Sequence, residues 1–443
     1  MSRLRLRRHA VLEARRRGFE AVAERPPTRR DELDLLRALV VVGLVFFHTA
    51  VIFGAGEFPI KAATENRVAT VFLGFGATRG MPLLFLVSGM GIFYSLQSRS
   101  PAAFARERLR RLGVPLLVGL LTLVPLQAWL GLRRAGDPSS YARFYARFWD
   151  VRPALDFPFL ITAAPGGVFE TGHLWFLVCL LGFSLALLPA FAWLRRPAGR
   201  RLLERLTGQL ARPGGLLLLP ALPLAVVEAA LGSEAGHGGW HHGSYALFLL
   251  YGFLAAADPR TGETFQRQWR RAAAVGLLLF LATAAAAYGA ADAGAEPFTD
   301  MDPLSMAFRL LKSVDGWLWV AAVVGLAANR VQYSRSSRAQ PAAARRPDRA
   351  GRLRRLGAYA NDAVLPFYVL HEPVIVVVAY FVLAWPVGGG AQYSVIALVS
   401  LAATLLLYDL GVRRTPLTRL LFGLKQLGGP APRTAAHSAH QVR

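Results

Sequence analysis

The chain has 443 residues, 54% of them hydrophobic, and a formal net charge of +24 at pH 7. Apolar runs of about 20 residues recur along it, and such a run crosses a hydrocarbon core about 30 Å thick, which excludes a soluble enzyme with a single anchor. The basic residues gather in alternate loops between these runs, as membrane orientation requires, so we expect no nucleic-acid partner. The only cysteine is Cys179, so neither an intramolecular disulfide nor a thiolate metal cluster can form.

Ten apolar runs predict an all-α membrane domain over residues 31–425, preceded by a basic arm at 1–30 in which we expect no cleavable signal peptide. The predicted spans are, in chain order, about 35–53, a bent second span that ends near 97, then 112–132, 173–194, 214–231, 244–257, 272–290, 314–329, 359–384 and 390–411. Residues 304–313 are expected at the membrane interface, the Arg-rich segment 330–357 as a disordered loop, and 426–443 as a flexible tail.

The loop charges predict the orientation of these spans. Basic residues crowd both termini and the loops near 100–111, 195–212, 258–271 and 330–357. An even number of spans places all of these segments in the cytoplasm, in agreement with the positive-inside rule. The loop at 133–170 is an exception, because it carries several arginines on the opposite side. We therefore predict ten transmembrane helices with both termini cytoplasmic, in the inner (plasma) membrane.

The first span, LDLLRALVVVGLVFFHTAVIF, carries Arg37 near its start and His48 deep inside it. Eleven residues of α-helix turn through about 1100°, so the two side chains lie on one face, roughly 16 Å apart along the axis. Arg37 alone could be a positive-inside flank, and His48 alone could be a histidine bonded to a neighbouring helix. Ionisable groups at membrane depth are expensive, however, and usually mark a functional site.

Other polar groups are expected to converge on the same region. His173 opens the fourth span directly after Glu170, and His371–Glu372 lies near the middle of the ninth span. A structural His371–Glu372 pair remains an alternative. The histidines around Trp240 match no strong zinc-ligand spacing and favour a glycine-rich interfacial loop, so we predict no metal site; these are His237, His241 and His242.

The chain resembles the acyltransferase-3 superfamily of integral-membrane O-acyltransferases, whose hallmark is an Arg, ten residues and then a His in the first span. LDLLRALVVVGLVFFH supplies that pattern through Arg37 and His48, with the usual Asp34 before it. MPLLFLVSGM, FARERLRRLGVPLL, HLWFLVCLL and LPFYVLHEPVI agree with later motifs in the same order, over about residues 31–425. LFLLYGFLAA and RTPLTRLLFGLK make the chain most similar to the glucan-biosynthesis protein C branch, which is linked to glucan succinylation.

The resemblance implies transfer of an acetyl or succinyl group from cytoplasmic acyl-CoA, a co-substrate rather than a permanently bound cofactor, to a hydroxyl of an extracytoplasmic glycan. His48 would act as general base or form an acyl-histidine, with His371 or Glu372 orienting the base or the acceptor. Arg37 would meet the phosphates of the donor, and Trp175 would offer a stacking surface for a sugar. The residues assigned to substrate binding are Asp34, Arg79, Arg108, Arg111, Glu170, His173 and Trp175, with Arg110 as a further phosphate ligand and Arg309 or Lys312 as alternatives to Arg79 for a succinyl carboxylate.

Two other classes of function stay open at this point. A transporter or flippase of a lipid-linked saccharide also needs about ten spans and polar groups at the midplane, although the two halves show no convincing inverted repeat. A non-catalytic membrane scaffold would not require Arg37 and His48 on one helix face. The expected partners are acyl-CoA, a carbohydrate acceptor, the lipid bilayer and, as an open alternative, a second copy of the chain in a homodimer.

Overall fold

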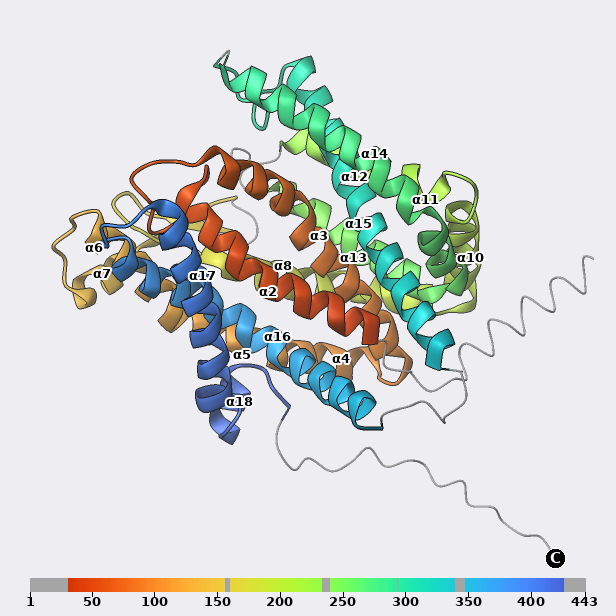
Figure 1. Ribbon diagram of the computed structural model, residues 1–443. Helices are drawn as coiled ribbons and strands as arrows, with labels where there is room; N and C mark the ends of the chain where they lie inside the picture. The colour runs from red at the N-terminus through yellow and green to blue at the C-terminus, as the bar shows by residue number, and fades with distance from the viewer. Residues whose placement is uncertain (1–30, 156–159, 233–239, 293, 339–346, 426–443) are drawn as a thin grey trace, which may run out of the picture.

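The computed structural model describes residues 31–425 apart from 156–159, 233–239, 293 and 339–346 (Figure 1). The predicted arm at 1–30 and tail at 426–443 lie outside the described residues. The α-helices are α2 (Asp31–Phe53), α3 (Arg67–Gln97), α4 (Pro101–Arg108), α5 (Val114–Val118), α6 (Val124–Arg134), α7 (Tyr141–Phe148), α8 (Trp175–Ala186), α9 (Leu188–Leu194), α10 (Pro197–Leu210), α11 (Gly215–Leu218), α12 (Ala221–Leu231), α13 (Ser244–Ala257), α14 (Pro259–Asp292), α15 (Pro303–Arg338), α16 (Pro347–Val382), α17 (Gly389–Leu406) and α18 (Pro416–Leu421). The remaining elements are the π-helical turns η1 (Leu109–Gly113), η2 (Gly119–Leu123) and η7 (Leu407–Val412), the 3₁₀ turns η3 (Gly172–Leu174) and η5 (Trp240–Gly243), and the antiparallel strands β1 (Val151–Pro153) and β2 (Ile161–Ala163).

Within the described part of the chain, seven helical segments are long and apolar enough to cross a membrane, and two bent helix pairs raise that number to at most nine. The bends measure 47° between α8 and α9 and 105° between α10 and the α11–α12 segment. The predicted sixth span, α13, has only 14 residues, about 21 Å of helix against a hydrocarbon core of about 30 Å. The all-α membrane fold is confirmed, whereas the number ten and the side on which the termini lie stay predictions.

The loop predicted at 330–357 is shorter in the structure. Helix α15 continues to Arg338 and α16 begins at Pro347, so both flanks of this segment are helical rather than disordered. Arg, Ala and Gln have good helix propensity, and an existing helix is extended more easily than a new one is nucleated. Only residues 339–346, which lie outside the described residues, remain as the predicted loop. Residues 304–313 form the first turns of α15.

Helix α13 packs directly against the backbone of α3. A Cβ atom at Gly89 would collide with the carbonyl of Leu249, and one at Gly252 would collide with the carbonyl of Leu86. Small residues at such a crossing let two helix backbones approach closely, which is the usual packing device inside membranes. This contact makes α13 an interior helix of the bundle, and the buried Phe253 extends the contact along it.

The third predicted span, 112–132, lies within one longer continuous segment, Pro101–Arg134, built from α4, η1, α5, η2 and α6. Its two π-helical turns directly precede the segments that carry Pro115 and Pro125. Proline removes a backbone donor, and π-helical turns are a common way to accommodate a local change in the helical register.

Helix α2 lies at the centre of the arrangement that forms the site. It packs against α3, α16 and α17, while α16 also packs against α6 (Figure 1). The segment between α6 and α8 contains α7 and the β1–β2 pair, and the rings of Phe144 and Phe148 are fully buried there. Helix α16, the ninth predicted span, therefore connects α2 with the third span through α6 and with the start of the fourth span through η3.

Candidate active site

Three histidines and a glutamate from separate parts of the sequence form one buried group, here called the histidine cluster: His48 on α2, His173 on η3, and His371 and Glu372 on α16. His371 is completely buried, and His173 and Glu372 are each only 4% exposed. The ring centroid of His371 lies 5.2 Å from that of His48 and 5.4 Å from that of His173. The structure thus brings these four residues together, whereas Arg37, which we expected in the same region, lines a cavity that none of the four lines.

Glu372 is the centre of the histidine cluster. Its Oε2 lies 3.4 Å from His48 Nδ1, and its Oε1 lies 3.5 Å from His173 Nδ1. The side-chain amide of Gln127, on α6, donates a hydrogen bond of 2.9 Å to the same Oε1. A buried carboxylate needs such partners, because an isolated charge in a low-dielectric interior is unstable. Each carboxylate oxygen therefore serves one histidine.

A proline on α16 explains how His173 is held. Pro373 has no N–H group, so the carbonyl four residues earlier, that of Val369, has no intrahelical donor from this position. His173 Nε2 lies 3.1 Å from that carbonyl oxygen and donates to it. A carbonyl only accepts, so Nε2 carries a proton. The Nδ1 contact with Glu372 is then favourable when either His173 is an imidazolium or Glu372 holds the shared proton.

Gly172 gives this turn its shape. Its φ angle is +48°, a left-handed conformation that side chains disfavour. A Cβ atom at this position would also collide with the side-chain amide of Gln127. Glycine at residue 172 therefore permits both the turn into η3 and the approach of Gln127 to Glu372.

His371 has one fixed and one unsatisfied ring nitrogen. Its Nδ1 donates to the carbonyl of Tyr368 over 2.6 Å. Its Nε2 is buried, and the described residues give it no hydrogen-bond partner. Buried polar atoms are normally satisfied, so an unpartnered imidazole lone pair inside a membrane bundle fits a group that meets a proton or a substrate.

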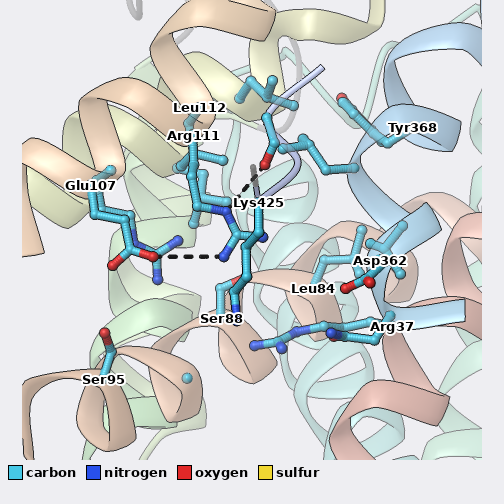
Figure 2. A pocket seen from close by; sticks show the side chains of 18 of the residues that line it. Arg37, Leu84, Ser88, Ser95, Glu107, Arg111, Leu112, Asp362, Tyr368 and Lys425 are labelled. Atoms are coloured by element: carbon cyan, nitrogen blue, oxygen red, sulfur yellow. Dashed lines mark hydrogen bonds and ion pairs between the residues drawn. The ribbon is translucent and has the colours of Figure 1, made fainter. Parts of the chain in front are cut away.

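Arg37 lies in a separate cavity of about 420 Å³ toward the start of α2 (Figure 2). Its Nη2 donates to the carbonyl of Val87 over 2.9 Å, and its Nη1 lies 3.7 Å from Asp34. A Cβ atom at Gly91 would stand only 2.6 Å from Arg37 Nη2, so this glycine lets the guanidinium approach α3. Asp34 thus holds Arg37 rather than lining the cavity itself.

The cavity is strongly basic. Figure 2 shows Arg37 and Arg111 reaching into it from different helices. Its charged lining comprises the cations Arg37, Arg99, Arg108, Arg111 and Lys425 and the acids Glu107 and Asp362. Glu107 pairs with Arg99 and lies 3.8 Å from Arg111, and the excess of positive charge suits an anionic ligand such as a phosphate. Arg110 is not among the residues that line the cavity.

Tyr368 joins the cavity to the histidine cluster. It lines the cavity, and its hydroxyl donates to the backbone carbonyl of His173. The residues lining the cavity do not include His48, His371 or Glu372. The two parts of the site therefore lie one after the other along α2 and α16, and the ring of Tyr368 stands between them.

Glu170 lies close enough to Glu372 and His173 to interact with their charges, and it is not among the residues that line the cavity. Its side chain is exposed, yet partial desolvation, followed by the charges of Glu372 and Glu57, raises the pKa of this carboxyl to about 7. Trp175 lies apart from these groups, with its ring centroid 4.7 Å from that of His242 and 5.3 Å from that of Tyr245.

Three predicted substrate cations have other partners. Arg79 forms a buried ion pair of 2.5 Å with Asp315 and lies over the ring of Phe75. Arg309 is fully buried and donates to the backbone carbonyls of Pro297, Asp300 and Ala229. Lys312 pairs with Glu228 at 3.2 Å. None of the three is among the residues that line the described cavity.

Several residues of the site could not be predicted from the sequence, because no pattern marks them as functional. Gln127 lies within a predicted span as an ordinary polar residue, and Tyr368 looks like part of an apolar run. Lys425 follows α18 at the end of the described chain and reaches the cavity only through the fold. In the sequence, the basic lining of the cavity is indicated only by the Arg-rich loop before the third predicted span.

The comparisons with known proteins identify the family of the chain. A family model described as an acyltransferase domain (Acyl_transf_3) matches residues 30–409. That range includes every member of the histidine cluster and all charged residues of the cavity except Lys425. No curated protein and no solved structure gives a significant match. Since the family model covers most of the chain, the protein belongs to the acyltransferase-3 superfamily and is an integral-membrane acyltransferase.

Proposed function

We propose that this acyltransferase moves an acyl group from cytoplasmic acyl-CoA to a hydroxyl group of an extracytoplasmic glycan or glycosylated acceptor. The observation that carries the proposal is the division of one helix, α2, between two chemical environments. Arg37 lies in a basic cavity at one end, and His48 contacts Glu372 beyond it. An acyl-CoA donor, which carries phosphates at one end and a thioester at the end of a long arm, fits a basic cavity followed by a histidine.

The basic cavity would bind the acyl-CoA donor through positive charge. The phosphates of the CoA nucleotide would be held by Arg37, Arg108 and Arg111 through charge-assisted hydrogen bonds. The pantetheine arm would run along α2 past Tyr368, bringing the thioester to the histidine cluster. The roughly 16 Å of helix between Arg37 and His48 suits an arm of this kind.

The chemical step uses His48 as the base. Glu372 Oε2 lies 3.4 Å from His48 Nδ1, so a proton on Nδ1 would face the carboxylate and leave the Nε2 lone pair for the acceptor. As the hydroxyl oxygen attacks the thioester carbonyl, its proton passes to Nε2. The C–S bond then breaks, and the same proton is returned to the departing CoA thiolate. Glu372 stabilises the transient imidazolium, as the carboxylate does in a Ser-His-Asp triad.

A covalent route through an acyl-histidine is the alternative order of events. It would be distinguished by an acylated protein that accumulates when the donor is supplied without an acceptor. The contact between Glu372 and His48 Nδ1 suits both routes, because each uses the Nε2 lone pair.

The proposal also concerns which acyl group is transferred and which acceptor receives it. The similarity to the glucan-biosynthesis protein C branch favours a succinyl group and a glucan, but Arg79, Arg309 and Lys312 are already bound to protein groups. A succinyl carboxylate would need another cation, and an acetyl group would need none. Inner-membrane location and a homodimer stay predictions.

The proposal is tested with purified protein, isotopically labelled acetyl-CoA or succinyl-CoA, and envelope glycans as acceptors. We expect free CoA thiol and labelled glycan to appear together, and His48→Ala to abolish both while the protein still inserts and folds. His241→Ala, which removes a histidine outside the cluster, is the matched control and should transfer normally. A transporter would neither bind nor cleave acyl-CoA, so the absence of both in the wild type would refute the proposal.

A further inference from the structure

The last described part of the chain forms one wall of the basic cavity. Helix α18 packs against α5, and residues 416–425, here called the C-terminal strap, continue from it to Lys425 at the cavity. Lys425 lies more than 300 residues from the arginines beside it in sequence. Only the fold brings this cation to the site.

The strap is fixed to the cavity wall by its backbone. Arg111 Nε donates to the carbonyl of Gly423 over 3.2 Å. Gly423 has a φ angle of +71°, and a Cβ atom there would collide with the carbonyl of Arg111. Leu424 is 5% exposed and packs in a small buried cluster with Leu370 and Tyr408.

Lys425 itself is held in place from the other side. The guanidinium of Arg419 donates twice to the carbonyl of Lys425, over 2.9 and 2.6 Å. The amide of Leu424 donates to the carbonyl of Arg419 over 2.7 Å, which closes the turn. The backbone of Lys425 is therefore positioned by direct contacts.

The side chain of Lys425 lines the cavity beside Arg111 (Figure 2). The described residues give its ammonium group no carboxylate partner, whereas Arg111 has Glu107 at 3.8 Å. A cation directed to an already basic cavity raises the electrostatic cost of the empty site, and an anionic ligand would offset that cost.

We propose that the C-terminal strap belongs to the donor site, with Lys425 binding a phosphate group of the CoA nucleotide next to Arg111. The inference rests on the proposed acyl-CoA donor and adds a phosphate ligand from outside the membrane bundle. Because the backbone of the strap is bonded to Arg111, docking of the strap and phosphate binding stabilise each other. Removal of the strap would leave the histidine cluster intact and weaken only the binding of the acyl-CoA donor.

The test measures equilibrium binding of CoA to the purified full-length protein in detergent. Lys425→Ala is expected to weaken CoA binding about tenfold, or about 1.4 kcal/mol, and to flatten the dependence of affinity on salt. Lys425→Arg should restore most of the affinity. Gly423→Ala should weaken binding as well, because it displaces the strap. Arg414→Ala is the control, since Arg414 is exposed near the same helix and bonds to the carbonyl of Asp409 outside the cavity.

The outcomes separate this inference from the proposed function. If the wild type binds CoA and Lys425→Ala binds it equally well, the role of the strap is refuted and the donor assignment stands. If Arg414→Ala loses as much affinity for CoA as Lys425→Ala, the loss comes from the general surface charge rather than from a contact in the cavity, and the inference again fails. If the wild type does not bind CoA, the donor assignment and the inference fall together. Lys425→Gln, which removes the charge but keeps a polar side chain only one atom shorter, replaces Lys425→Ala if the latter does not fold.

Discussion

Glu372→Gln is the most informative substitution, because Glu372 contacts two histidines and Gln127 at once. The amide is nearly isosteric but uncharged, and one end of it becomes a donor. His48 then loses the carboxylate that faces its Nδ1 and the negative charge that stabilises its protonated form. Gln127, which itself donates to Glu372, would have to turn or lose its bond.

The size of the effect follows from the geometry. Replacing the carboxylate by an amide in a Ser-His-Asp triad lowers kcat by about 10⁴-fold. The contact of 3.4 Å between Glu372 and His48 is longer than an ideal charged hydrogen bond. We therefore expect a loss of about 10²–10³-fold in kcat. The KM for acyl-CoA should stay within about threefold of the wild-type value, because Glu372 does not line the donor cavity.

The assay measures CoA thiol release at saturating acceptor over a range of acyl-CoA concentrations. Asp409→Asn is the matched control, since it makes the same chemical change at an ion pair with Arg413 near α18. A Glu372→Gln enzyme that keeps more than a third of the wild-type kcat would refute the role given to this carboxylate. So would a loss confined to KM.

Three further results are expected. Arg79→Ala should lower the melting temperature and the free energy of unfolding by about 3–5 kcal/mol, because it leaves Asp315 buried and unpaired; Arg79→Met with Asp315→Leu should recover most of the loss, and no recovery would contradict the pairing argument. Glu170 holds a proton to about pH 7 in the folded state and only to about 4.5 otherwise, so its contribution to stability falls as pH rises between these values. Glu170→Gln should therefore raise the melting temperature relative to the wild type at pH 8 but not at pH 4, and an equal difference at both values would refute the shift. Cysteines introduced at the exposed Arg205 and Glu296 should react with a membrane-impermeant thiol reagent from opposite sides of the membrane, and labelling from one side would overturn the predicted orientation.

Sequence patterns predicted the parts of this fold that local chemistry determines. The apolar length of α2 and the spacing of Arg37 and His48 require only helix geometry and a hydrocarbon core. Residues His371 and Glu372 stood out because ionisable groups at membrane depth are expensive. The number of spans stays a prediction, since an apolar run such as α13 can be short when other helices bury it.

Contacts between distant helices could not be predicted in this way. Arg79 looked like a free intramembrane cation because its partner, Asp315, lies 236 residues away. Gln127 had no visible role until α6 was placed against α16. The contribution of Pro373 became apparent only when His173 was found at the carbonyl that this proline leaves without a donor. Each of these is a property of helix register rather than of a local pattern.

The central claim is that Arg37 recognises the donor while His48 performs the chemistry. The most direct measurement compares CoA affinity and single-turnover acyl transfer in the purified Arg37→Ala and His48→Ala variants. The account predicts that His48→Ala binds CoA as tightly as the wild type and transfers nothing, whereas Arg37→Ala binds CoA about tenfold more weakly and transfers at a near-normal rate once saturated. Acyl transfer by His48→Ala, or unchanged CoA affinity in Arg37→Ala, would contradict it.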